Sequence, residues 1–224
     1  MICVIPARGG SKRIPLKNIA SFHGRPMIAW SIAAAREVFA RVVVSTDEAR
    51  VAEVARAEGA EVLDRPAALA GDLTPTVPVI AHAVTALGLG AAVPVCCLYA
   101  TAPMVEPADL RAAAARLASG DATYVMAVTR YPYPITRALR RDAAGHVAMI
   151  DPSRMQTRSQ DLEEAWHDAG QFYFARALTW AAGLPVFGPG AVGIVLPAHR
   201  VVDIDTPEDW TRAEALFAVA RGQG

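Results

Sequence analysis

The chain has 224 residues, 53% of them hydrophobic, and its 22 basic side chains balance its 22 acidic ones. This balance argues against nucleic acid and membrane surfaces as partners, because both recruit proteins through an excess of positive charge. The length suits one domain with a full core, and no apolar run reaches the ~20 residues of a membrane span.

Strand-like and helix-like segments alternate along the first 128 residues. Apolar runs predict strands at 2–5, 42–44, 61–63, 94–99 and 123–128. Helical spacing predicts helices at 26–39, 48–58, 76–87 and 107–117. Continuous apolar strands separated by helices indicate an α/β fold, in which a mostly parallel sheet has helices on both faces. We expect one domain over residues 1–224.

The alternation stops between Arg130 and Asp168. The segment Tyr131-Pro132-Tyr133-Pro134 cannot continue a helix or a central strand, because proline lacks the backbone donor and fixes φ. Strand patterns return at 171–174 and 191–196, and a last helix is expected at 207–219. An irregular segment of this length within one domain is usually functional, so we predict that residues 130–168 form an inserted arm.

The cysteines and the first residues bear on the compartment. The sequence starts directly with a strand pattern and shows no signal peptide, which predicts a cytoplasmic protein. Cys3, Cys96 and Cys97 lie in apolar strand-like runs. We interpret them as buried thiols in a reducing compartment rather than as a disulfide or a metal cluster.

The loop after the first strand is unusual in its cations. The chain has only two lysines, Lys12 and Lys17, and both lie in this loop beside Asn18, the only asparagine. Codon bias could explain the scarcity of lysine but not this clustering, which predicts a site that needs a compact charge. With the Gly9-Gly10 pair, the loop is typical of a phosphate cradle at the carboxyl end of a strand. It matches neither the dinucleotide G-x-G-x-x-G pattern nor the Walker pattern.

Two aspartates near the C-terminus form a second cluster. Asp203 and Asp205 end an apolar strand pattern, and in extended backbone their side chains point the same way. Like charges so placed repel unless a cation lies between them, and carboxylates together with phosphate oxygens suit Mg²⁺. The alternative is that Asp205 or Thr206 caps a helix starting at Pro207, which leaves Asp203 unexplained.

Three motifs occur here in the order found in the CMP-sialic acid synthetase family, the cytidylyltransferases for nonulosonic acids. They are the Arg8–Asn18 loop, Arg65-Pro66-Ala67-Ala68-Leu69-Ala70-Gly71-Asp72, and Asp203-Ile204-Asp205-Thr206-Pro207-Glu208-Asp209. The chain resembles this family over nearly its whole length, which implies a Rossmann-like nucleotidyltransferase fold. Arg13 and the segment 156–173 resemble the members that act on pseudaminic acid.

The resemblance implies transfer of CMP from CTP to the anomeric hydroxyl of pseudaminic acid, with release of diphosphate, for surface or flagellar glycans. It assigns catalytic roles to Arg8 and Lys12, which would position the phosphates and stabilise developing charge, and to Asp205, which would act through the metal ion. It assigns Mg²⁺ to Asp203 and Asp205. It assigns nucleotide contacts to Ala7, Arg8, Gly9, Gly10, Ser11, Lys12, Lys17, Asn18, Arg65, Thr74 and Thr76.

Family members are homodimers in which the arm reaches the partner's sugar pocket, and the resemblance implies the same here. Arg158 would then face the sugar carboxylate, in the same or the other subunit; the alternative is an ion pair with Asp161 or Glu163. The other candidate sugar contacts are Tyr99, His167, Asp168, Gln171 and Tyr173, although a tyrosine in a strand also suits a core position.

One segment departs from the sialic acid enzymes, which carry a Gln-Pro-Thr-Ser-Pro-Leu-Arg-like turn. This chain reads Tyr99-Ala100-Thr101-Ala102-Pro103-Met104-Val105 there, which favours a 6-deoxy, diamino sugar over N-acetylneuraminate. The alternatives within the family are CMP-N-acetylneuraminate and CMP-legionaminate synthesis. Outside it they are a D-x-D glycosyltransferase, whose motif usually lies in mid-chain, and a non-catalytic nucleotide-binding module, which needs no carboxylate pair.

Overall fold

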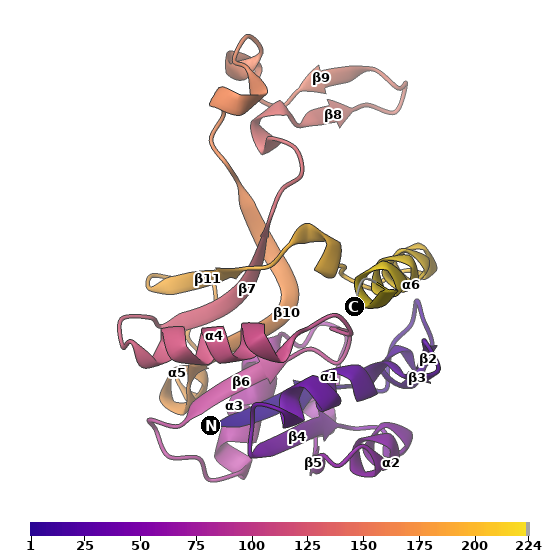
Figure 1. Ribbon diagram of the computed structural model, residues 1–224, viewed down its shortest axis with the longest axis vertical. Helices are drawn as coiled ribbons and strands as arrows, with labels where there is room; N and C mark the ends of the chain where they lie inside the picture. Colours follow the sequence, from indigo (N-terminus) through magenta and orange to yellow (C-terminus); the bar gives the residue numbers. More distant parts are fainter. Residues whose placement is uncertain (223–224) are drawn as a thin grey trace.

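A seven-stranded sheet lies at the centre of the computed structural model, which describes residues 1–222. The strand order is β11-β7-β10-β6-β1-β4-β5, and all neighbours are parallel except the pairs that β10 makes with β6 and β7 (Figure 1). The strands are β1 Ile2–Pro6, β4 Arg41–Thr46, β5 Glu61–Asp64, β6 Pro94–Leu98, β7 Tyr124–Arg130, β10 Trp166–Arg176 and β11 Ala191–Val195. The prediction of a mostly parallel sheet is confirmed.

Helices cover both faces of this sheet, as the sequence predicted. Helices α1, α2 and α4 bury side chains such as Ile28, Val51 and Leu110 on one face, and α3 and α5 bury Ile80 and Trp180 on the other. The helices are α1 Met27–Arg36, α2 Ala49–Ala57, α3 Thr76–Ala86, α4 Pro107–Ala118, α5 Ala177–Ala181 and α6 Pro207–Gly222. Within residues 1–222, no helix combines the length and the apolar character needed to cross a membrane.

The central strands are apolar at consecutive positions because both of their faces are covered. Cys3 of β1 lies beside Cys96 of β6, and with Cys97 these residues are buried, free thiols, as predicted. Burial raises the pKa of the Cys96 and Cys97 thiols well above the usual value, so both stay neutral. Their role is therefore packing rather than chemistry.

A smaller apolar cluster holds α6 against the end of the sheet. Val202 and Ile204 are buried there together with Phe22 and Phe217. Phe22 belongs to a short hairpin formed by β2 Ser21–Phe22 and β3 Arg25–Pro26. The segment 201–205 pairs with no strand in the described chain, so the predicted strand before the aspartates is wrong. Its apolar side chains are buried by α6 and the hairpin rather than by the sheet.

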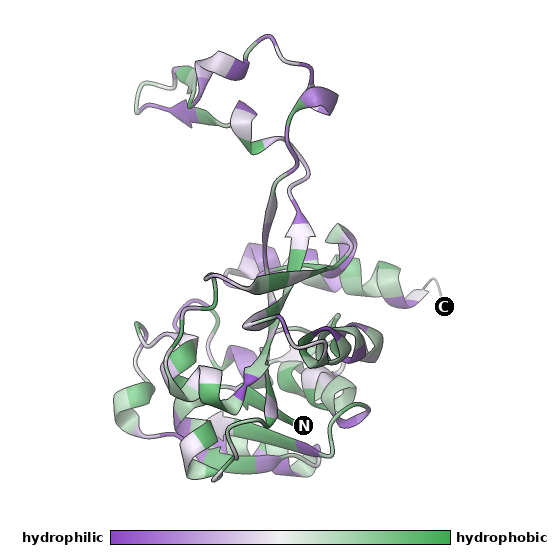
Figure 2. Ribbon diagram, turned by 90° about the vertical axis from the view of Figure 1, so that its left-hand side faces the viewer, coloured by the Kyte–Doolittle hydropathy of each residue, from purple (hydrophilic) through white to green (hydrophobic). Residues whose placement is uncertain are grey.

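The arm, residues 130–168, leaves the body through the extended ends of β7 and β10 and stands away from it (Figures 1 and 2). Its outer part contains the antiparallel pair β8 Leu139–Arg141 and β9 Val147–Met149 and several short 3₁₀ helices. In Figure 2 the body is predominantly hydrophobic along its strands, whereas the arm mixes polar and apolar residues. Because β10 begins at Trp166, His167 and Asp168 belong to the sheet.

Candidate active site

The loop formed by residues 7–18 follows β1 at the carboxyl end of the parallel strands, where open α/β sheets bind their ligands. The buried Ala7 donates its backbone N–H to the Ser45 carbonyl at 2.9 Å, which continues the ladder to β4. Gly9 N–H donates to Asp47 Oδ1 at 3.1 Å. A Cβ at Gly9 would lie 2.7 Å from Glu48 Cβ, so the loop can pass α2 this closely only with glycine.

The end of the same loop is fixed by a strained turn. Leu16 has φ of 51°, a left-handed conformation that is uncommon outside glycine. The 3₁₀ helix Lys17–Ile19 follows directly, and Asn18 Nδ2 donates to the Arg8 carbonyl at 2.9 Å. This bond ties the two ends of the loop together, which fixes where Lys17 lies.

Lys17 connects the loop to the aspartates near the C-terminus. Its ammonium donates to Asp205 Oδ1 at 3.1 Å and to the Ile204 carbonyl, and Arg13 Nη2 lies 2.6 Å from Asp205 Oδ2. Burial by itself would raise the pKa of Asp205, but the hydrogen bonds and charges of Lys17 and Arg13 outweigh it and hold this pKa below its usual value. The two predicted clusters therefore meet.

Asp203 and Asp205 project from the same side of their extended segment, because the residues on its other side, Val202 and Ile204, are buried. Among residues 1–222, no side chain donates a hydrogen bond to Asp203. Desolvation raises the pKa of Asp203, and the negative charge of Asp205 is the second largest cause of this rise. Both effects disfavour the charged form of Asp203.

The helix-capping alternative applies to Thr206 and not to Asp205. Thr206 Oγ1 accepts the backbone N–H of Asp209 at 3.2 Å, and Asp209 Oδ2 accepts the N–H of Thr206 at 2.8 Å. This reciprocal pair is a capping box at the start of α6. The Asp205 side chain is left free to interact with Lys17 and Arg13.

Two adjoining cavities lie at this end of the sheet. The larger, of about 210 Å³, is lined by Pro6, Arg8, Ser11, Lys17, Asn18, Arg65, Thr74, Thr76, Val79, Tyr99, Ala100 and Thr101. The smaller, of about 60 Å³, is lined by Arg8, Ser11, Lys12, Arg13, Ile14, Lys17 and Asp205. The structure thus brings most of the predicted nucleotide contacts together around one space that reaches Asp205.

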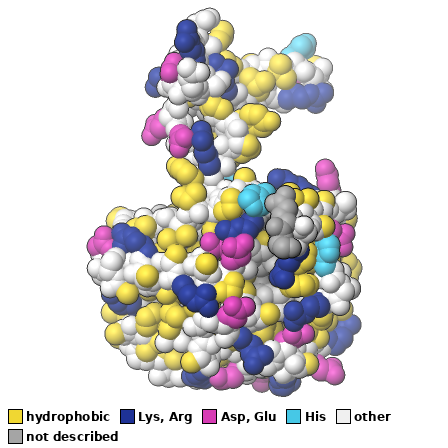
Figure 3. All heavy atoms as spheres, in the orientation of Figure 1, with side chains coloured by type: hydrophobic (Ala, Val, Ile, Leu, Met, Phe, Trp, Pro, Cys, Tyr) yellow, Lys and Arg dark blue, Asp and Glu magenta, His cyan; other side chains and the backbone are white. Residues whose placement is uncertain are grey.

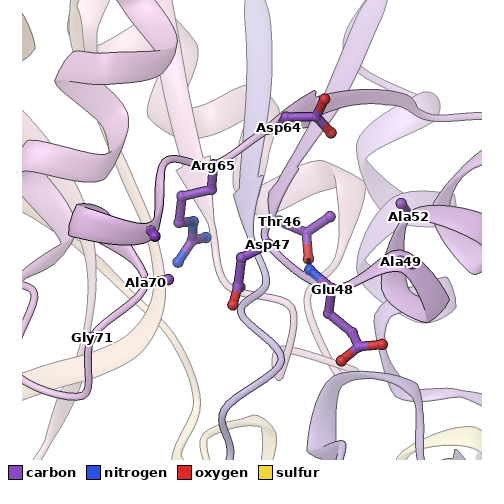
Figure 4. A pocket seen from close by; sticks show the side chains of 10 residues that line it. Thr46, Asp47, Glu48, Ala49, Ala52, Asp64, Arg65, Ala70 and Gly71 are labelled. Carbon is purple, nitrogen blue, oxygen red and sulfur yellow. Dashed lines mark hydrogen bonds between the residues drawn. The ribbon is translucent and has the colours of Figure 1, made fainter.

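Arg65 forms the wall between this space and a neighbouring hollow of about 650 Å³ beside β4 and β5 (Figure 4). Its Nη2 donates to the Ser45 carbonyl at 2.6 Å, which fixes the buried guanidinium. Burial lowers the pKa of Arg65, and the charge of Asp47 works against this effect. Figure 4 shows Asp47 next to Arg65, while Asp64 points away from both.

Arg8 and Lys12, the remaining predicted triphosphate cations, both contact Asp72. One oxygen of its carboxylate pairs with Arg8 Nη1 and the other with Lys12 Nζ. The hydrogen bond from Lys12, followed by that from Arg8, lowers the pKa of Asp72. Asp72 lies in a motif that the sequence singled out, but nothing in the sequence alone indicated this pairing.

Three of the predicted sugar contacts form a hydrogen-bonded group next to the larger cavity. Tyr99 Oη lies 2.8 Å from Thr76 Oγ1, and the rings of Tyr99 and Tyr173 are 5.5 Å apart. Tyr173 donates its hydroxyl to Asp168, whose other oxygen accepts the N–H of Gly170 at 2.9 Å. Burial raises the pKa of Tyr99 to about 12 and that of Tyr173 further, so both hydroxyls remain donors.

The other predicted sugar contacts are more scattered. Gln171 is buried, and its amide nitrogen donates to the Arg200 carbonyl at 2.6 Å. The His167 ring packs on Tyr131 with centroids 4.7 Å apart. Arg158 lies in the arm, away from the loop of its own chain (Figure 1). Asp47 was missed as a site residue, although its place directly after a buried strand could have indicated it.

The sheet, the glycine loop and the aspartates define an α/β nucleotidyltransferase. Residues 2–182 match the model of the family described as cytidylyltransferase. The chain is 39% identical to the pseudaminic acid cytidylyltransferase of Campylobacter jejuni, over 97% of this chain and 96% of that protein. It is 32% identical to the N-acylneuraminate cytidylyltransferase B of Danio rerio, over 94% of this chain and 50% of that protein.

A solved structure of CMP:2-keto-3-deoxy-manno-octonic acid synthetase complexed with CTP is also similar, with a TM-score of 0.69 and 20% identity over 98% of both chains. At this identity the similarity supports the fold alone. The sequence identities and the family match show that the chain belongs to the cytidylyltransferase family, as its motifs predicted.

Proposed function

We propose that this enzyme transfers CMP from CTP to pseudaminic acid and releases diphosphate. The observation that carries the proposal is the meeting of Lys17 and Asp205, which brings the cationic glycine loop and the aspartates to one space. The identity to a pseudaminic acid cytidylyltransferase over nearly the whole of both chains supports this sugar.

In this proposal the nucleotide occupies the larger cavity. Arg8, Lys12 and Lys17 neutralise the triphosphate. The N–H of Gly10 lies in the same loop and can add a backbone donor, whereas the N–H groups of Gly9 and Ser11 are bonded to Asp47 and to the Gly9 carbonyl. Asn18, Arg65, Thr74 and Thr76 line the same cavity and surround the cytidine. The cations come from a loop whose two ends are tied to each other, so the site is preorganised.

The reaction is a displacement at the α-phosphorus of CTP. The anomeric oxygen of the sugar forms a bond to this phosphorus, the bond to the bridging oxygen of diphosphate breaks, and the hydroxyl proton passes to water. Negative charge grows on the leaving diphosphate, where Arg8 and Lys12 stabilise it. In this proposal, positioning and charge stabilisation account for catalysis.

Asp203 and Asp205 are suitable ligands for Mg²⁺. They present two carboxylates on one side of a short segment, and the pKa of Asp203 is raised by burial and by the charge of Asp205, which a bound cation would relieve. No group of three metal-ligating side chains occurs in the described part of the chain. Two carboxylates with phosphate oxygens still match the preference of Mg²⁺. When bound, the ion would add charge neutralisation and lower the pKa of the hydroxyl.

We also propose a homodimer in which the arm covers the sugar site of the partner. Hydrophobic side chains lie at the surface of the arm, away from the body (Figure 3). Tyr133 is among them, with 80% of its surface exposed. The β8–β9 pair is too small to be stable alone, so a second copy is the expected support. Arg158 would then reach the sugar carboxylate in trans, near Tyr99, His167, Asp168, Gln171 and Tyr173 of the other subunit.

We place the reaction in the cytoplasm, where free buried thiols such as Cys3 persist.

The test is diphosphate release from CTP and MgCl₂ with pseudaminic, legionaminic or N-acetylneuraminic acid. We expect the highest kcat/KM with pseudaminic acid. Faster release with either of the other acids would replace the proposed sugar. CTP binding without release would indicate a non-catalytic module, and transfer from a CMP-sugar without diphosphate would indicate a glycosyltransferase.

A further inference from the structure

Two carboxylates, Asp205 and Asp72, form ion pairs with the cations of the loop, and they differ in how firmly the protein holds them. Asp205 belongs to a segment whose neighbours are buried, and it holds Lys17 and Arg13. Asp72 belongs to the exposed connection between β5 and α3, and its neighbour Leu73 is 97% exposed. Packing therefore fixes Asp205, whereas the ion pairs are the main attachment of Asp72.

Asp72 stands where an anionic ligand would be expected. Its two oxygens contact Arg8 and Lys12 separately, as two oxygens of a phosphate group would. Arg8 and Lys12 line the smaller cavity together with Lys17. Without a carboxylate or a phosphate, these cations would repel one another in the free enzyme.

We propose that Asp72 is a built-in phosphate substitute, which occupies Arg8 and Lys12 in the free enzyme, leaves when CTP binds, and returns to displace diphosphate after transfer. This inference rests on the proposed function, because it takes Arg8 and Lys12 as the cations that hold the triphosphate. Asp72 thereby determines the affinity for CTP and the rate of product release.

The exposure of the ion pairs makes the exchange feasible. The side chains of Arg8, Lys12 and Asp72 are each at least 32% exposed, and exposed ion pairs contribute little to stability. A polyphosphate carries more negative charge than one carboxylate and offers more acceptor oxygens to the same two cations, so it displaces Asp72 at a modest cost. Replacing the Asp72 carboxylate should therefore increase the affinity of Arg8 and Lys12 for anions without affecting the fold.

The test measures binding of inorganic diphosphate to the full-length protein by calorimetry. We expect Asp72→Asn to bind diphosphate about three- to tenfold more tightly than the wild type. Asp64→Asn is the matched control, because it removes the same charge from the end of β5 and Asp64 makes no ion pair within residues 1–222. Its affinity should equal that of the wild type, and Asp72→Glu, which keeps the competing charge, should stay within about twofold of it.

Two results separate this inference from the proposed function. If Asp72→Asn binds diphosphate no more tightly than the wild type, while Lys12→Ala loses binding, Asp72 is not a competitor and the inference is overturned. If Arg8→Ala and Lys12→Ala both bind diphosphate normally, the loop does not hold the phosphates and the proposed function fails as well. In turnover, Asp72→Asn should also show stronger inhibition by added diphosphate.

Discussion

The ammonium of Lys17 and the carboxylate of Asp205 form a hydrogen bond of 3.1 Å, although 188 positions separate them in the sequence. Lys17 belongs to the loop after β1, and Asp205 to the segment that α6 holds against the hairpin. Their contact unites two motifs that could each be explained separately as a basic loop and a helix start. The candidate site depends on both.

We expect Asp205→Asn to reduce diphosphate release on the order of 10²-fold or more while the protein stays folded, because the change removes one of the two carboxylates proposed to hold the metal and a partner of Lys17. Turnover with CTP and pseudaminic acid, together with a thermal unfolding curve, tests both parts. Glu208→Gln is the control, since it removes an exposed charge from the first turn of α6. Activity of Asp205→Asn close to that of Glu208→Gln would remove the metal assignment.

The two lysines differ in a way that only the structure shows. The sequence predicted a place where arginine does not fit, and the structure assigns this property to Lys17, whose side chain is 16% exposed, rather than to Lys12, which is 80% exposed. Lys17→Arg should destabilise the fold by about 1–3 kcal/mol, because a guanidinium must be accommodated between Ile204 and Asp205.

Urea unfolding of Lys17→Arg and Lys12→Arg provides the comparison. We expect the exposed Lys12→Arg change to leave the free energy of unfolding within about 0.5 kcal/mol of the wild type. Equal stability of the two variants would contradict the interpretation of Lys17 as the confined cation.

The parallel part of the fold was predictable because strands buried on both faces are apolar at every position. The reversed direction of β10 was not, since it depends on the path by which the arm returns to the sheet. For the segment 201–205, the sequence pattern indicated burial of alternate residues. It could not show that α6, rather than a neighbouring strand, covers Val202 and Ile204.

Similar limits apply to the site. The loop after β1 and the aspartates could be picked out as one candidate site, because glycines, clustered lysines and paired carboxylates have few other common uses in this order, and the structure brings them together. Pairing of Asp72 with Arg8 and Lys12 was not recognisable, because it depends on where an exposed connection folds back 64 positions later. Isolated carboxylates in loops carry no signal of their partners.

Gly9→Ala should destabilise the protein by about 1–3 kcal/mol, because its Cβ would lie 2.7 Å from Glu48 Cβ and the start of α2 would have to move. Gly10→Ala is the matched comparison, since its nearest contact is the flexible end of Arg8 at 3.3 Å. The free energy of unfolding should therefore fall much more for Gly9→Ala. Similar losses in both variants would argue against a close approach of this loop to α2.

Asp203→Asn should stabilise the metal-free protein while abolishing turnover. The pKa of Asp203 is raised by desolvation and by Asp205, so the folded state disfavours its charge at pH 7. Neutralising it should raise the free energy of unfolding in EDTA, by no more than about 0.5 kcal/mol because Asp203 is exposed. Asp209→Asn should have the opposite effect, because the carboxylate of Asp209 accepts the N–H of Thr206 in the capping box. A loss of stability in Asp203→Asn would contradict this assignment.

Mixing two inactive variants should restore activity if the arm acts across a dimer. Asp205→Asn damages the body of a subunit and Arg158→Ala damages its arm, so each homodimer has two defective sites. In a mixed dimer, the intact body of the Arg158→Ala subunit would receive the intact arm of the Asp205→Asn subunit, which completes one site. The other site carries both defects.

The measurement uses equal amounts of the two variants, refolded together or exchanged at low concentration. Diphosphate release should approach about a quarter of the wild-type rate, because half of the dimers are mixed and each mixed dimer has one working site. No recovery in mixtures whose heterodimers are demonstrated by differential tags would show that Arg158 acts within its own chain or not at all.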